Sequence, residues 1–250
     1  MAQQASQERG QVGDIEDLGS LRQILADRSK FDPCSCPDCA SLCHGVPGIY
    51  DPAHLLRLIS KGTTLAKLVP DLVEDFYLDE LGEGVPPVFY LRPRMNSERA
   101  GGVAPMIPTV GSCSRLGPGG CTLARGEMPI GCISAYACRE APSCGKSRAV
   151  EMWDTDEGRE LIRLFEEESR RQTPGSVLGT EAVAHKTDTL AQMGPLGDII
   201  MRMAMREVQQ HRESARNAIA RVQASARGSG SQAAARPGVV FEAGKGSTKQ

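Results

Sequence analysis

The residues best suited to chemistry in this chain are its nine cysteines, which fall in two tight groups. The first group lies in FDPCSCPDCASLCHG and the second in GSCSRLGPGGCTLARGEMPIGCISAYACREAPSCG. Thiolates are the ligands that zinc and iron–sulfur centres favour. We therefore expect the cysteines to bind a metal. In chain order they are Cys34, Cys36, Cys39, Cys43, Cys113, Cys121, Cys132, Cys138 and Cys144.

The spacing within the first group suits a metal-binding loop. Cys36 and Cys39 are separated by two residues, so a reversing loop could turn both thiols toward one metal ion. Cys43 follows four residues later and could supply a third ligand. The second group would then complete the shell from far along the chain and clamp the two halves of the domain together.

Disulfides are the competing use of grouped cysteines. The first residues, MAQQASQERGQVGDIEDLG, have neither the basic nor the apolar region of a secretory signal. No apolar run is long enough for a transmembrane helix. We therefore expect no membrane association and a cytoplasmic location, where disulfides rarely persist. The odd number of cysteines also argues against a closed disulfide framework.

The order of these motifs resembles the zinc- or iron-chelating cysteine-rich proteins, a family that includes the flagellin lysine-N-methylases. Its pattern is a C-x-x-C-x-x-C-C knuckle, a helical stretch, and then three spaced cysteines. The resemblance covers about residues 31–144 and departs from the pattern in two places. Leu42 stands where the first cysteine of the C-C pair belongs, and Met128-Pro129 replaces Arg-Pro. Cys34 is an extra thiol that could substitute for the missing one.

The resemblance implies chelation of zinc or iron, including an iron–sulfur cluster, by a set of matched cysteines. The closing position falls to Cys138 or Cys144. Eight ligands could serve two mononuclear sites, or four could hold one cluster and leave the others spare. His44 could replace a thiolate, although a loop histidine bonded to backbone is the simpler interpretation. The positions that match the motif are Cys36, Cys39, Cys43, Cys113, Cys121 and Cys132.

The remaining pattern predicts a mainly α fold with a short β element, in which a metal-stapled cysteine-rich domain is followed by C-terminal helices. Asp51 as N-cap and Pro52 at the first position predict a helix that ends before Gly62. The sequence predicts further helices over 14–28, from 65 to 81 with a break at Pro70, over 154–171, and over 195–224. It predicts one strand over 88–91 and a polar connector over 172–194. The expected segments are a disordered leader (1–13), the cysteine-rich domain (14–150), a helical extension (151–224) and a disordered tail (225–250).

Composition restricts the partners. The net charge is -2 and aromatic residues make up 4% of the chain, so a nucleic-acid partner is not expected. Apolar residues begin the last predicted helix, where we expect core packing or a helix–helix contact, with a protein-binding face as the alternative. They are Ile199, Ile200, Met201, Met203 and Met205.

Two functions follow from these patterns. The first is a metal-binding protein with a structural, redox-sensing or partner-docking role. The alternative is an iron- or cluster-dependent enzyme, such as a protein-modifying methylase, that uses an open position on its metal. Acid pairs such as Glu74-Asp75 and the run Glu166-Glu167-Glu168 are expected on exposed helical faces rather than in a catalytic dyad.

Overall fold

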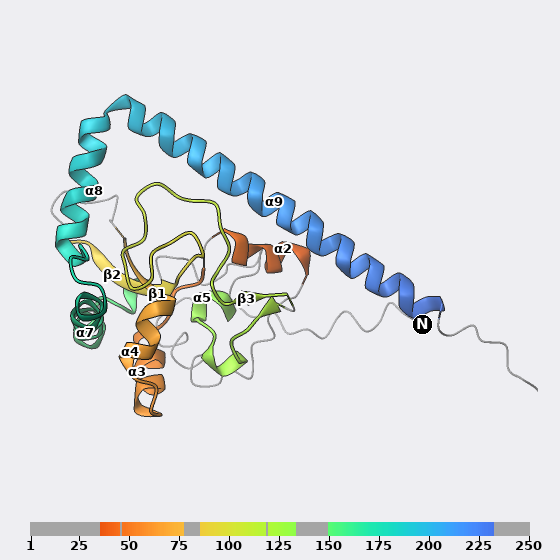
Figure 1. Cartoon of the computed structure of the whole chain (residues 1–250), viewed down its shortest axis with the longest axis horizontal. Helices are drawn as coiled ribbons and strands as arrows, with labels where there is room; N and C mark the ends of the chain where they lie inside the picture. The colour runs from red at the N-terminus through yellow and green to blue at the C-terminus, as the bar shows by residue number, and fades with distance from the viewer. Residues whose placement is uncertain (1–35, 46, 78–85, 119, 134–149, 233–250) are drawn as a thin grey trace, which may run out of the picture.

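The computed structural model describes residues 36–45, 47–77, 86–118, 120–133 and 150–232. Short helices and a two-stranded antiparallel sheet form the first part of the chain, and three longer helices follow it (Figure 1). The first part contains α2 (Pro37–Ala40), η2 (Ser41–His44), α3 (Pro52–Ser60), α4 (Leu65–Leu68), η3 (Val69–Asp71), β1 (Leu72–Tyr77) and β2 (Val88–Pro93). The rest contains β3 (Leu116–Gly117), β4 (Gly120–Cys121), η4 (Arg125–Glu127), α5 (Ile130–Ile133), α7 (Asp156–Gln172), α8 (Gly179–Met193) and α9 (Pro195–Gln232). A mainly α fold with a short β element is therefore confirmed.

The helix predicted after Asp51 forms as α3. The carboxylate of Asp51 accepts a hydrogen bond of 2.7 Å from the backbone amide of His54, which satisfies one of the free N–H groups at the helix start. Pro52 occupies the first turn, and Gly62 follows the end with φ of +94°. The side chain of His54 is buried at 1% exposure and stacks on the ring of Tyr50.

The helix predicted from residue 65 to 81 is wrong over residues 72–77, and residues 78–81 lie outside the described part of the chain. Leu72–Tyr77 forms strand β1 and pairs antiparallel with β2, so that Val73 lies opposite Arg92. Consecutive buried residues in LVEDFY fit a strand covered on both faces as well as they fit a helix, and the partner strand decides the outcome. The predicted strand at 88–91 is confirmed and extends to Pro93.

The sheet also changes the place of the acid pair Glu74-Asp75. Glu74 is 1% exposed, and one of its oxygens accepts a hydrogen bond of 2.7 Å from the amide of Gly179. Asp75 pairs with Arg92 at 3.0 Å. The expectation of a solvated helical face was therefore wrong for this pair. For the run at 166–168 it was right for Glu167 alone, because the side chains of Glu166 and Glu168 are only 18% and 12% exposed. All three carboxylates pair with arginines along α7.

The segment after residue 150 belongs to the same core as the segment before it. The core joins residues of α3, β1 and β2 to residues of α7 and its approach. Trp153 is 1% exposed, and its indole N–H donates a hydrogen bond of 2.8 Å to the carbonyl of Tyr50. Residue 150 therefore does not divide one hydrophobic core from another. The core residues are Ile49, Tyr50, Leu55, Val69, Leu72, Tyr90, Leu91, Val150, Trp153, Leu161, Ile162 and Phe165.

Helix α7 starts at the cap residue Thr155, whose hydroxyl accepts a hydrogen bond of 3.1 Å from Gly158. The polar connector expected over 172–194 is wrong, because most of it forms helix α8. Ala182 on one face of α8 is buried. Helix propensity alone did not predict a helix in so polar a segment.

Helix α9 runs as a long rod past α2 (Figure 1) and continues to Gln232, beyond the expected end near residue 224. Core packing is wrong for Ile199, Met203 and Met205, which are 47%, 67% and 54% exposed, whereas Ile200 and Met201 are half-buried. The alternative, a protein-binding face, stays a prediction. Among the described residues, none of the helices combines the length and apolar character that a membrane crossing requires. The leader 1–13, the predicted helix 14–28, Leu81 and residues 233–250 lie outside the described residues.

Candidate metal centre

Four cysteines from separate segments lie near one another. Cys43 belongs to η2, Cys113 follows the loop after β2, Cys121 ends the β3–β4 hairpin, and Cys132 lies in α5. Their thiols interact electrostatically, as the pKa shifts described below show. We refer to Cys43, Cys113, Cys121 and Cys132 as the thiol cluster.

Backbone hydrogen bonds place Cys113. Its amide donates a hydrogen bond of 2.7 Å to the carbonyl of Cys43, which fixes η2 against the loop. Cys113 also forms an antiparallel bridge with Met95, just after β2. The amide of Ser114 donates a hydrogen bond of 2.8 Å to the carbonyl of Arg94, so this segment continues the backbone pairing beyond β2. The two-stranded sheet, extended by this pairing, therefore fixes the position of Cys113 in the cluster.

The hairpin that follows brings in Cys121. Leu116 in β3 pairs with Cys121 in β4, and the amide of Thr122 donates a hydrogen bond of 2.8 Å to Arg115. Gly120 allows this tight reversal with φ of +110°.

Cys132 is placed by a close backbone approach. A Cβ added at Gly48 would lie 2.2 Å from the amide nitrogen of Cys132, and one added at Gly131 would lie 2.6 Å from the nitrogen of Ile49. The amide of Gly131 also donates a hydrogen bond of 3.2 Å to the carbonyl of Ile49. Only glycine permits this contact, because any side chain would overlap the opposite backbone. The sequence contains both glycines, but only the fold shows that they face each other.

Burial and mutual repulsion both disfavour bare thiolates in the cluster. Burial is the larger cause that raises the pKa of Cys43 to about 11, and the charges of Cys113 and Cys121 add to it. Burial likewise raises the pKa of Cys132, followed by the charge of Cys43. Burial also raises the pKa of Cys113, and the charge of Cys121 contributes. A metal cation would offset this repulsion, because coordination deprotonates a thiol.

Tyr50 connects the cluster to the core. Burial raises the pKa of its phenol, and the charge of Cys132 is the next largest cause. Its carbonyl accepts the indole hydrogen bond of Trp153. The thiol cluster and the buried core therefore share Tyr50 as a neighbour.

The donor chemistry of the cluster fits zinc or iron, but the side chains do not form a coordination shell as they stand. Within the part of the chain that the structure describes, no group of three or more His, Cys, Asp or Glu side chains is arranged to hold a metal ion. The main chain therefore brings four thiols into one neighbourhood, whereas binding would require their sulfur atoms to converge further.

The C-x-x-C motif lies in a different local structure from the one expected. Cys36 is the N-cap of α2, and Cys39 is buried in its single turn. The amide of Ala40 donates a hydrogen bond of 2.9 Å to the carbonyl of Cys36, so the motif is a helical turn and not a reversing loop. Helix α2 contacts α9. Cys34, Cys138 and Cys144 lie outside the described residues.

His44 was expected to bond to the backbone, but its ring faces a histidine of α9. The ring centroids of His44 and His211 are 5.5 Å apart and the rings are inclined at 62°. Burial is the main cause that lowers the pKa of His44, and the charge of His211 adds to it. The sequence carried no signal for this pair, because a helix far along the chain supplies the second ring.

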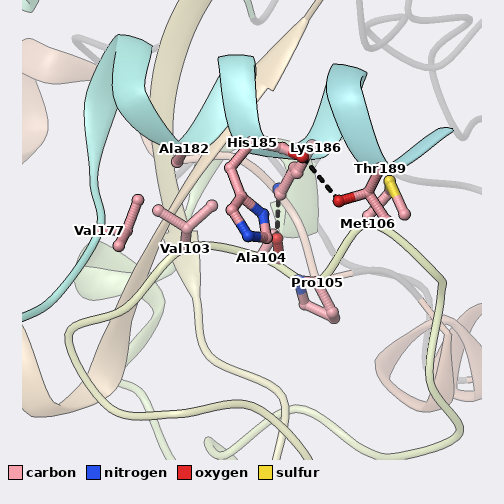
Figure 2. A pocket seen from close by; sticks show the side chains of 9 residues that line it. All are labelled: Val103, Ala104, Pro105, Met106, Val177, Ala182, His185, Lys186 and Thr189. Carbon is pink, nitrogen blue, oxygen red and sulfur yellow. Dashed lines mark hydrogen bonds between the residues drawn. The ribbon is translucent and has the colours of Figure 1, made fainter. Parts of the chain in front are cut away.

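A pocket of about 340 Å³ lies between α8 and the loop after residue 102 (Figure 2). Its walls are mainly apolar, and Lys186 donates a hydrogen bond to the carbonyl of Ala104. The ammonium group of Lys186 also lies 4.5 Å from the centre of the Phe76 ring. Burial is the main cause that lowers the pKa of Lys186. The residues that line the pocket are Val103, Ala104, Pro105, Met106, Val177, Ala182, His185, Lys186 and Thr189.

This pocket is separate from the cysteine chemistry, since none of its lining residues is a cysteine. Its amine is already engaged by a carbonyl and an aromatic ring, so it offers shape and apolar surface rather than a poised catalytic group. The thiol cluster is the stronger candidate site for this reason.

Comparison with known proteins adds no relative. No protein-family model, curated protein or solved structure matches this chain. The resemblance to the metal-chelating cysteine-rich family stays a prediction.

Proposed function

We propose that the protein binds zinc or iron, including iron as an iron–sulfur cluster, through Cys43, Cys113, Cys121 and Cys132. The observation that carries this proposal is that four separate segments bring Cys43, Cys113, Cys121 and Cys132 close enough for their charges to interact. The hydrogen bond of 2.7 Å from the amide of Cys113 to the carbonyl of Cys43 joins two of these segments directly. Four thiolates are a complete ligand set for tetrahedral zinc and for the common iron–sulfur clusters.

The surrounding structure supports a stabilising role for the metal. Between residues 94 and 133, the described chain forms only two two-residue strands and two short helical turns. Thiolate bonds from Cys113, Cys121 and Cys132 would fasten this stretch to η2. Structural zinc in small peptides contributes on the order of 10–16 kcal/mol of apparent binding free energy, which is comparable to the stability of a whole domain.

The first test is to purify the protein without oxygen, record its visible spectrum, and measure zinc, iron and acid-labile sulfide per chain. Stoichiometric zinc in colourless protein would indicate a structural or docking site. Iron with sulfide in brown protein would indicate a cluster and favour a redox-sensing role or the enzymatic alternative. Absence of zinc and iron from protein purified this way and supplied with both metals would overturn the proposal.

Cys121→Ser best separates loss of metal from loss of folding, because Cys121 is exposed and its replacement leaves no cavity in the core. We expect this variant to fold but to lose metal. Cys36→Ser is the matched control, since Cys36 is the N-cap of α2 and serine is favoured at that position. The control should retain the metal of the cluster. Complete metal loss from Cys36→Ser, or full metal content in Cys121→Ser, would contradict the assignment of ligands.

A further inference from the structure

Helix α9 lies against α2 and η2 of the cysteine-rich region (Figure 1), and polar side chains take part in this contact. Arg212 Nε lies 3.4 Å from the hydroxyl of Ser41, and the ion pair between Arg216 and Asp38 spans 3.6 Å. Both members of the ion pair are about half exposed, so water screens their attraction. These two polar interactions are therefore weak ties between α9 and the cysteine-rich region.

The rings of His44 and His211 meet where α9 contacts η2, and each ring has a buried nitrogen that forms no hydrogen bond. These atoms are Nδ1 of His44 and Nε2 of His211. A buried polar atom that forms no hydrogen bond costs free energy and calls for an explanation such as a bound ion or water. Two such atoms on neighbouring rings point to a shared ligand.

The spacing of the rings fits a cation between them. Metal–nitrogen distances are about 2.0–2.1 Å, so two imidazoles that meet one ion at a tetrahedral angle have ring centres roughly 5 Å apart. The observed separation is 5.5 Å. Imidazole nitrogen suits zinc, copper, nickel and cobalt, whereas magnesium and calcium prefer oxygen ligands.

We propose that His44 and His211 form a second cation site, at which a divalent transition-metal ion such as zinc joins α9 to η2. The site uses imidazoles, not the thiol cluster, and does not depend on the function proposed above. No third His, Cys, Asp or Glu side chain in the described ranges completes it, so water fills the other positions. The ion therefore exchanges readily, and its binding controls how firmly α9 is held.

Cobalt(II) distinguishes this site from the thiol cluster, because cobalt bound to thiolate gives an intense charge-transfer band that cobalt bound to imidazole lacks. The full chain, with its purified metal content in place, is titrated with cobalt. We expect one further equivalent to bind without the thiolate band, and to slow amide exchange in α9 around residue 211.

His211→Ala should lose this equivalent and the slower exchange, while its circular dichroism shows that α9 remains helical. His185→Ala is the matched control, since His185 lies exposed on α8. A second variant, His44→Ala, should behave like His211→Ala. Equal cobalt binding by His211→Ala and the unmodified chain would overturn the proposal. It would also be overturned if all the bound cobalt showed the thiolate charge-transfer band. A bridging water would then account for the two nitrogens. The metal site proposed for the thiol cluster is tested separately: if Cys121→Ser has the same metal content as the unmodified chain, that site is contradicted and the histidine site is not.

Discussion

The amide of Cys113 donates a hydrogen bond of 2.7 Å to the carbonyl of Cys43, and so joins the two cysteine groups through the main chain. The bond joins main-chain atoms of η2 and of the segment in which Cys113 pairs with Met95. The thiols are therefore brought into one neighbourhood by the fold itself. A metal that binds there would meet ligands that the fold already holds close together. The entropy cost of closing the loops between them is then not charged to metal binding.

Replacement of Gly48 by alanine should displace Cys132. The added methyl group would lie 2.2 Å from the nitrogen of Cys132 and 2.4 Å from the carbonyl carbon of Gly131, so the two backbones must separate. We expect a loss of about 1–3 kcal/mol in the free energy of unfolding. Denaturant unfolding followed by the fluorescence of Trp153, the single tryptophan, measures this loss. Gly126→Ala is the control, because a Cβ there meets no atom within 4 Å. Equal stability of the two variants would show that the segments are not packed as described.

Replacement of Glu74 by glutamine should remove a pH dependence of stability. Burial is the main cause that raises the pKa of Glu74 from 4.5 to about 7, while the hydrogen bond from Gly179 opposes it. The folded state thus holds the proton more tightly than the unfolded state. The contribution of Glu74 to the free energy of unfolding should be greatest below pH 4.5 and should fall as pH rises to 7. The difference amounts to about 3 kcal/mol at most.

In Glu74→Gln this fall should be absent, and the variant should be more stable than the unmodified chain at pH 8. Glutamine can still accept the hydrogen bond from Gly179. Unfolding free energies of both proteins between pH 5 and 8 test the prediction. The exposed substitution Glu167→Gln removes the same formal charge and controls for net charge. An unchanged slope in Glu74→Gln would show that Glu74 does not bind a proton on folding.

Replacement of Arg92 by methionine should strongly destabilise the sheet. Its guanidinium group bonds both oxygens of Glu98, at 2.9 and 2.6 Å, and also bonds Asp75. Arg92 and Glu98 are both buried, so loss of the arginine leaves an uncompensated carboxylate inside. We expect a cost of about 3–5 kcal/mol in the free energy of unfolding.

The second substitution Glu98→Gln should restore part of the loss caused by Arg92→Met, because it removes the buried charge while it keeps an acceptor for the amide of Met95. A double-mutant cycle measures this coupling. Arg163→Met is the control, since Arg163 pairs only with exposed carboxylates of its own helix among the described residues. Simple additivity of the Arg92 and Glu98 substitutions would contradict a direct buried pair.

Local signals explain which elements could be predicted. Asp51, Pro52 and Gly62 specify the ends of α3 through backbone hydrogen bonds and backbone angles within a few residues, so the sequence is enough. The segment 72–77 could not be assigned in this way, because its buried residues suit a covered strand as well as a helix. Its pairing with β2 depends on a distant segment, and that pairing gives β1 its structure.

The sequence by itself determined the mainly α character of the protein, the ends of α3, the strand at 88–91 and the grouping of the cysteines. The tertiary structure alone decided that Cys43, Cys113, Cys121 and Cys132 are neighbours, that Cys36 lies at the N-cap position of α2, and that His211 meets His44. The physical reason is that caps and periodicity act over a few residues. Proximity of side chains from distant segments depends on how the sheet, the hairpin and α9 pack, and no local pattern in the sequence records it.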